Sequence, residues 1–255
     1  METHRIAVAD SQSIVLDWFP TTAGARVALF VHGLGSHRRG EKASYFAERF
    51  NARGWAYAAV DLRGHGEADG SIRDLTLSGL LTDLGAAMSW LAKRSVAGHP
   101  ILIGSSMGGA VIAWYALEHA GEVGPLVMIA PSLSFPSGIA TQIGPDALRE
   151  WQESGVRRWQ SEWLDIEVGY AFMHDAGHYE PSRLQTELQS PLFILHGMRD
   201  ETIDWRASTA FADGCHSQCD VLLLKEGDHR LTEYKSFLFD ALWAWLQRST
   251  EHAHT

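Results

Sequence analysis

Residues 100–109 read PILIGSSMGG, and this stretch decides the fold. The apolar run Ile101–Ile103 predicts a buried strand, and a helical pattern begins a few residues later at Met107. Between them lies Gly104-Ser105-Ser106-Met107-Gly108, a G-x-S-x-G sequence in which the serine occupies a sharp turn. The glycines on either side have no Cβ, so the backbone can approach neighbouring segments closely. We therefore expect a strand, a tight turn and a helix, with Ser106 Oγ exposed at the carboxyl edge of a sheet.

The rest of the chain alternates short aliphatic runs with longer helical patterns. This alternation predicts an α/β fold: a doubly wound, mostly parallel sheet with helices on both faces. The runs that read as buried strands are Arg26–Val31, Ala56–Val60, Ile101–Ile103, Leu126–Ile129, Leu192–Leu195 and Val221–Leu224. Ile6–Val8 and Ile14–Trp18 fit an antiparallel hairpin at the sheet edge. Helices are expected at Glu41–Arg53, Ser78–Lys93, Met107–His119, Trp205–Ala212 and Leu231–Gln247.

One long segment interrupts this alternation. Residues 134–189 contain no convincing strand, but they contain helix-compatible stretches and three tryptophans, Trp151, Trp159 and Trp163. Such a segment is long for a loop in a compact domain, so we expect a small helical cap inserted into a core of residues 1–133 and 190–255. The tryptophans are candidates to bind an apolar acyl chain or an aromatic leaving group; alternatively, they anchor the cap to the core.

A serine nucleophile needs a general base and an orienting carboxylate, which follow it in the order acid, then histidine, in this type of sheet. Asp200 ends the sequence HGMRD after one predicted strand, and His229 lies in GDHR after the next. Because the carboxyl ends of parallel strands share one edge, Ser106, Asp200 and His229 are expected to meet there. Two other acids compete with Asp200: Asp204, which is also placed to cap the next helix, and Asp228.

A glycine-rich turn follows the strand that ends at Val31. It reads His32-Gly33-Leu34-Gly35, and it is placed to bring a backbone N–H group to the serine. We expect the N–H groups of Leu34 and Met107 to form an oxyanion hole, with a plain strand-to-loop turn as the alternative. His32 reads as a structural histidine that bonds within this loop.

Composition excludes several classes of protein. The 255-residue chain has 21 basic and 31 acidic residues and a formal net charge of −10, which makes nucleic acid an unsuitable partner. Cys215, Cys219 and His216 offer at most three soft ligands, so no metal site is expected. No apolar run is long enough for a membrane span, and the first ten residues lack a secretory pattern, so we expect a cytoplasmic protein.

Five motifs in order resemble the α/β-hydrolase superfamily along nearly the whole chain. They are HGLG at 32–35, DLRGHG at 61–66, GSSMGG at 104–109, HGMRD at 196–200 and GDHR at 227–230. More narrowly, residues 80–109 and 191–231 resemble the branch that includes abhydrolase domain-containing protein ten. Members of that branch act as palmitoyl-protein thioesterases and as esterases of acyl glucuronides.

This resemblance implies a serine hydrolase whose substrate is a small acyl ester or thioester. Ser106 would attack the acyl carbonyl, His229 would move the proton, Asp200 would hold the imidazole, and water would release the acyl group, without any metal or organic cofactor. Two alternatives remain open: hydrolysis of a carbon–carbon bond on the same fold, and a catalytically silent binding scaffold.

Several charged residues near these motifs are interpreted as structural. Asp61 and Arg63 are expected to tie loops together, because the resemblance places them in a turn beside the site. His37, Arg38 and Arg39 follow the glycine-rich turn, and we expect them to be solvated charges rather than ligands for a substrate anion.

Overall fold

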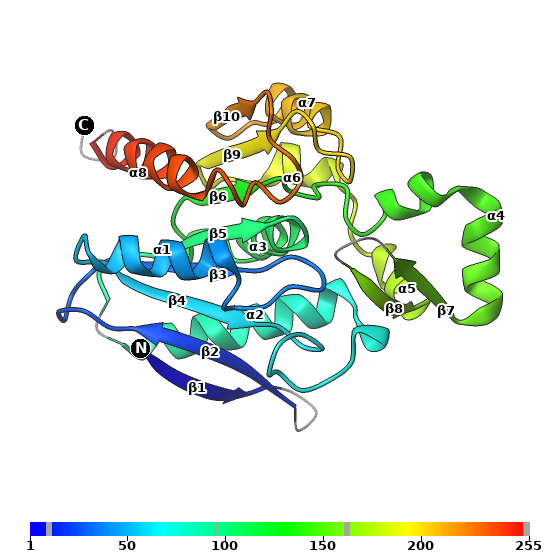
Figure 1. The fold of residues 1–255 in the computed structure, drawn as a ribbon, viewed down its shortest axis with the longest axis horizontal. Helices are drawn as coiled ribbons and strands as arrows, with labels where there is room; N and C mark the ends of the chain where they lie inside the picture. The colour runs from blue at the N-terminus through cyan, green and yellow to red at the C-terminus, as the bar shows by residue number, and fades with distance from the viewer. Residues whose placement is uncertain (9–11, 95, 161–163, 252–255) are drawn as a thin grey trace.

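The computed structural model describes residues 1–8, 12–94, 96–160 and 164–251. In this part of the chain the central feature is an eight-stranded sheet with the order β1-β2-β4-β3-β5-β6-β9-β10 (Figure 1). The strands are β1 Glu2–Ala7, β2 Ser13–Phe19, β3 Val27–Val31, β4 Ala56–Asp61, β5 Ile101–Ser105, β6 Leu126–Ile129, β9 Leu192–Gly197 and β10 Cys219–Leu224. β2 runs antiparallel to β1 and β4, and all other pairs are parallel. The predicted doubly wound, mostly parallel sheet is therefore confirmed.

Helices bury both faces of this sheet. Along β3, Leu29 belongs to one apolar cluster with helices α2 and α3, whereas its neighbour Phe30 belongs to a second cluster with α1 and α8. Successive strand residues point to opposite faces, so a continuous apolar run requires cover on both sides. The helices are α1 Glu41–Asn51, α2 Leu77–Ala92, α3 Met107–Glu118, α7 Arg206–Gly214 and α8 Lys235–Glu251.

The predicted helices match the observed ones to within about two residues, except α8, which begins and ends four residues later than expected. The helix was expected from Leu231 but begins at Lys235. Leu231 has a left-handed φ of 50°, and its N–H group donates to Asp228 Oδ1 at 2.7 Å. This turn delays the helix and ends the loop that carries His229.

The inserted segment lies beside the carboxyl ends of the parallel strands (Figure 1). It contains α4 Gly138–Ser154, α5 Ala171–Ala176 and α6 Ser182–Glu187, and also an antiparallel pair of strands, β7 Val156–Gln160 and β8 Asp165–Gly169. The expectation that it has no strand was wrong. These short strands carry charged residues on an exposed face, so they lack the continuous apolar run by which the core strands were recognised. The boundaries 134 and 189 of the cap stay a prediction.

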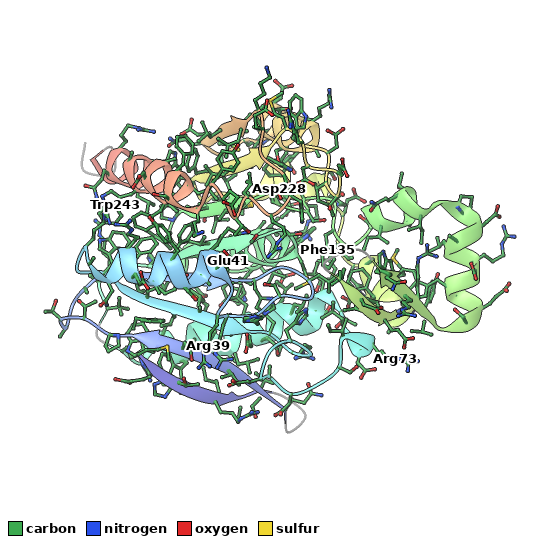
Figure 2. The ribbon with its side chains drawn as sticks, in the orientation of Figure 1. Arg39, Glu41, Arg73, Phe135, Asp228 and Trp243 are labelled. Carbon is green, nitrogen blue, oxygen red and sulfur yellow. The ribbon has the colours of Figure 1, made fainter. Side chains whose placement is uncertain are left out.

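Polar contacts join the cap to the core. Asp175 of α5 accepts hydrogen bonds from the Ser78 amide at 3.0 Å and the Ser78 hydroxyl at 2.5 Å, at the first turn of α2. Arg73, in the short 3₁₀ helix Ile72–Asp74, forms an ion pair with Glu167 of β8 at 3.7 Å. Figure 2 shows Phe135 at the junction and Arg73 directed toward the cap. The cap is thus fixed over one edge of the site.

Candidate active site

The turn between β5 and α3 presents Ser106. Its backbone has φ 53° and ψ −116°, a conformation that L residues rarely adopt. Glycines make the turn possible, because a Cβ at Gly104 would overlap the carbonyl of Gly108, and a Cβ at Gly108 would overlap the carbonyl of Val31. The predicted strand, turn and helix are present, and Ser106 stands at the carboxyl end of β5.

Ser106, His229 and Asp200 form one hydrogen-bonded chain. His229 Nε2 lies 3.1 Å from Ser106 Oγ, and His229 Nδ1 lies 2.7 Å from Asp200 Oδ2. The carboxylate accepts from Nδ1–H, which leaves Nε2 free to accept the serine proton. The side chain of Asp200 is fully buried, whereas that of His229 is 23% exposed. The structure therefore brings together the three residues expected from the sequence in the arrangement that activates a serine hydroxyl.

The loops after β9 and β10 are bonded to each other, which fixes Asp200 relative to His229. The Arg199 amide donates to the Gly227 carbonyl at 2.8 Å. On the other side, Lys42 of α1 donates to the Arg230 carbonyl, and burial lowers the pKa of Lys42 to about 8. The histidine loop is therefore held by β9 and by α1.

Asp200 is surrounded by hydrogen-bond donors. Its Oδ1 accepts the amides of Thr202 and Ile203, each at 2.8 Å. Its Oδ2 accepts from His229 and from His196, whose Nε2 lies 3.0 Å away. Burial opposes ionisation, but the hydrogen bonds from His196 and His229 outweigh it and hold the pKa of Asp200 well below its usual range. The carboxylate is thus ionised and fixed in orientation.

The two competing acids serve other contacts. Asp204 Oδ1 accepts the Arg206 amide at 3.0 Å at the start of α7, and the Asp204 side chain is 62% exposed. Asp228 accepts the Leu231 amide, as described above. Each carboxylate stabilises a local turn, so Asp200 is the acid that the geometry joins to His229.

The glycine-rich turn after β3 packs against the serine. A Cβ at Gly33 would lie 3.2 Å from Ser106 Cβ, so the turn and the nucleophile are in close contact. His32 Nδ1 donates to the Gly33 carbonyl at 2.8 Å, and His32 Nε2 accepts the Leu62 amide at 3.2 Å. Burial, reinforced by His65, lowers the pKa of His32 to about 3, so it is a neutral structural residue. The Leu34 backbone lies in this turn, where the oxyanion hole was expected.

The turn is further fixed by a buried ionic cluster. Arg38 is only 3% exposed, and its backbone amide donates to Asp61 Oδ1 at 2.6 Å. Its guanidinium also donates to Asp61 and forms ion pairs with Asp17 and Glu67. The expectation that Arg38 is a solvated charge was wrong, because its acceptors come from β2, β4 and the following loop. Asp61 ties loops together as expected.

A small apolar pocket of about 40 Å³ lies between the turn and the cap. Its lining residues come from the turn, the segment before α2 and the cap: Leu34, Leu75, Phe135, Ile139, Trp159, Val168 and Phe172. Of the tryptophans proposed to bind substrate, Trp159 lines it. Trp151 lies behind it, 1% exposed, with Nε1 donating to the Val168 carbonyl at 3.0 Å. Trp163 lies outside the described residues. Sequence reasoning missed Phe135 and Phe172, because only the folded cap brings them to Leu34.

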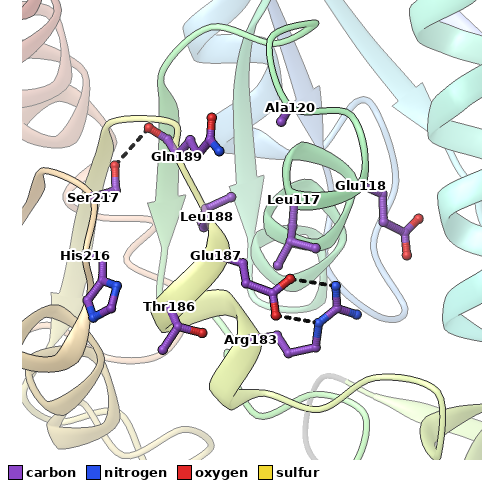
Figure 3. Close-up of a pocket in the computed structure, with 10 residues that line it drawn as sticks. All are labelled: Leu117, Glu118, Ala120, Arg183, Thr186, Glu187, Leu188, Gln189, His216 and Ser217. Atoms are coloured by element: carbon purple, nitrogen blue, oxygen red, sulfur yellow. Dashed lines mark hydrogen bonds and ion pairs between the residues drawn. The ribbon is translucent and has the colours of Figure 1, made fainter.

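A larger and more open cavity, of about 850 Å³, lies between the end of α3, α6 and residues 216–217 (Figure 3). Its walls mix polar and apolar side chains: Arg183 makes two hydrogen bonds to Glu187, Glu118 and His216 border it, and so do Leu117 and Leu188. None of the residues of the serine, histidine and aspartate chain lines it. They do not line the small apolar pocket either, but that pocket includes Leu34, whose turn contacts Ser106.

Within residues 1–8, 12–94, 96–160 and 164–251, no helix is both long and apolar enough to cross a bilayer. In the same ranges, no group of three or more His, Cys, Asp or Glu side chains is placed to hold a metal ion. The expected cytoplasmic location stays a prediction.

Comparison with known proteins places the chain among hydrolases. The family model described as serine aminopeptidase, S33, matches residues 23–168, which include Leu34 and Ser106. The palmitoyl-protein thioesterase ABHD10, mitochondrial, of Bos taurus is 29% identical over 212 residues, covering 80% of this chain and 67% of that protein.

Solved structures share the fold. The α/β-hydrolase domain-containing protein 10 from mouse has a TM-score of 0.84 at 22% identity and covers 97% of this chain and 99% of its own. Est1E from Butyrivibrio proteoclasticus, in a structure with bound ferulic acid, has a TM-score of 0.81 at 18% identity, with coverage of 96% and 98%.

Proposed function

The chain belongs to the serine aminopeptidase S33 family of α/β-hydrolases, and from this premise we propose that it cleaves carboxylic esters or thioesters through an acyl-enzyme on Ser106. The observation that carries the proposal is the chain from Ser106 Oγ through His229 to the buried Asp200, with distances of 3.1 and 2.7 Å. The same proposal assigns catalysis to these three residues.

The reaction follows from this geometry in two steps. Ser106 Oγ attacks the acyl carbonyl while His229 Nε2 takes its proton and passes it to the leaving alcohol or thiol. His229 then removes a proton from water, which attacks the acyl-enzyme, and His229 returns that proton to Ser106 Oγ as the acid is released. Asp200 stays ionised throughout and stabilises the imidazolium that forms in each step.

The oxyanion of each tetrahedral intermediate needs donors on the side opposite His229. We assign the N–H groups of Leu34 and Met107 to this role. Met107 is the first residue of α3, so no preceding turn of that helix accepts its N–H group, and the positive end of the helix faces the site. The contact between Gly33 and Ser106 brings the Leu34 turn to the same place. One such donor contributes roughly 3 kcal/mol to the transition state.

The apolar pocket supports a short acyl group as the preferred substrate. The pocket is small, about 40 Å³, and Leu34 places it beside the proposed oxyanion site. Aromatic and aliphatic side chains line it. A long chain such as palmitoyl, the group in the name of the Bos taurus relative, would require the cap to move away from Leu34.

Covalent labelling tests the proposed nucleophile. A fluorophosphonate probe should label the wild-type protein at Ser106 and should fail to label Ser106→Ala. His229→Ala should react far more slowly, because no base is left to activate the hydroxyl. Folded wild-type protein that resists the probe would overturn the proposal in favour of a silent scaffold.

A further inference from the structure

A second histidine contacts the acid of the candidate triad. His196 lies in β9, at the start of HGMRD, and its side chain is fully buried. Its Nε2 lies 3.0 Å from Asp200 Oδ2 and 3.2 Å from the Ile203 carbonyl. The sequence holds this motif, but nothing in it indicates what the histidine contacts.

The surroundings of His196 define its hydrogen-bond roles. Both neighbours of Nε2 are acceptors, so Nε2 carries a hydrogen. The other nitrogen, Nδ1, lies 2.7 Å from the hydroxyl of Ser208, which is also fully buried. In the neutral ring, Ser208 donates to Nδ1 and thereby fixes the tautomer that presents Nε2–H to Asp200.

We propose that His196 is a positioning residue for the hydrolytic reaction, acting through Asp200 and itself held by Ser208. This inference rests on the proposed function, because it assigns a role at the same site. Two imidazoles then share one carboxylate oxygen: His196 donates from the buried side, and His229 donates from the side of the serine. The hydrogen-bonded chain extends from Ser208 to Ser106.

His196 contributes a fixed direction to the carboxylate. The amides of Thr202 and Ile203 hold Oδ1, and without His196 the only described side chain that donates to Oδ2 is His229. The buried carboxylate would then be more basic and freer to rotate, because a desolvated charge depends on each of its donors. The reaction step would suffer more than substrate binding, because neither His196 nor Asp200 lines the apolar pocket at Leu34.

Two substitutions separate this role from a merely structural one. The side-chain amide of Gln extends to about the position of histidine Nε2, so His196→Gln keeps a donor for Asp200. The amide of Asn reaches only to about the position of Nδ1, so His196→Asn retains a polar contact with Ser208 and loses the donor. Both variants replace a buried imidazole by an amide, which makes them matched in polarity.

The kinetic test is hydrolysis of p-nitrophenyl acetate, with active sites counted by fluorophosphonate labelling. We expect His196→Asn to lower kcat roughly tenfold, the fold-change set by one hydrogen bond to a charged group, with little change in KM. The acidic limb of its kcat/KM profile should move to higher pH, and His196→Gln should restore both properties. Identical kcat values and pH profiles for the Asn variant, the Gln variant and wild type would overturn the inference.

A second measurement does not depend on turnover. The NMR resonance of the His229 Nδ1 proton reports its bond to Asp200, and in the Ser106→Ala background it can be compared among the same variants. We expect it to move in His196→Asn and to stay near its wild-type position in His196→Gln. An unmoved resonance in the Asn variant contradicts the role of His196, whereas absence of wild-type turnover contradicts only the proposed function.

Discussion

The carboxyl edge of the sheet and the cap are held together in different ways. At the sheet edge, buried charges have several partners each: Asp200 has four donors, and Arg63 makes three hydrogen bonds to the fully buried Asp83. In the cap, the ion pairs Arg158–Asp165 and Arg183–Glu187 are exposed, and Trp151 is the one buried residue of α4. Exposed pairs contribute little to stability. The groups at the sheet edge are thus held by buried polar networks, whereas these ion pairs of the cap lie at its surface.

This difference suggests a division of labour. The sheet edge determines whether an acyl group is transferred, because it fixes the nucleophile, base and acid. The cap determines which acyl group fits, because it supplies most of the pocket that faces Leu34. Substitutions in the two regions should therefore change different quantities.

The largest effect is expected from Ser106→Ala and His229→Ala. Each should lower kcat by about 10⁶-fold, because the members of a triad act as a unit. Steady-state hydrolysis of p-nitrophenyl acetate measures this loss, and circular dichroism verifies the fold. If Trp159→Ala in the cap abolished turnover to the same degree, the division of labour would be wrong.

The next effect distinguishes two acids within the sheet edge. Asp200→Asn should lower kcat by about 10⁴-fold, because an amide cannot stabilise the His229 imidazolium and favours the wrong tautomer. Asp204→Asn should remain near wild type, because Asp204 contacts only the start of α7. The same kinetic assay compares them. The reverse order would show that Asp204 is the triad acid.

Substitution of one glycine in each region compares how tightly the two regions are packed. Gly108→Ala should lower the free energy of unfolding by about 3 kcal/mol, because the new methyl overlaps the Val31 carbonyl in a packed core. Gly155→Ala in the cap should cost about 1 kcal/mol, since only its left-handed φ of 72° opposes a side chain and nothing lies within 4 Å. Urea unfolding measures both. Equal losses of unfolding free energy would mean that the turn between β5 and α3 is no more tightly packed than the cap.

The smallest effect concerns acyl selectivity. Phe135→Ala enlarges the pocket, so the ratio of kcat/KM for octanoate over butyrate esters should rise about tenfold, with little change in kcat for acetate. Trp90→Ala, on α2 at the far edge of the sheet, is a control that should leave the ratio unchanged. A ratio that responds equally to both substitutions would show that this pocket does not hold the acyl chain.

The sheet and the three central site residues could be predicted because their signals are local. A buried parallel strand requires a continuous apolar run, and the G-x-S-x-G turn requires glycines at fixed spacing. The strand, turn and helix around Ser106 can therefore be predicted from neighbouring residues alone. The carboxyl-edge rule then brings Asp200 and His229 to the same place.

Features that depend on distant partners could not be predicted. Arg38 is buried only because Asp17 and Asp61 converge on it from two strands. The β7–β8 hairpin has no continuous apolar face, so its strands look like loop sequence. His196 and Asp200 lie in one motif, but the tautomer that lets His196 donate to Asp200 depends on Ser208. This serine is in α7, which places it at the other nitrogen of the ring.

The most direct test of the central claim is hydrolysis of a series of p-nitrophenyl esters from acetate to palmitate, with a matching acyl-thioester series, by wild type beside Ser106→Ala. We predict turnover that depends on Ser106 and is greatest for short acyl chains. No turnover above the Ser106→Ala background on any member of either series would contradict the assignment of this protein as a serine ester or thioester hydrolase.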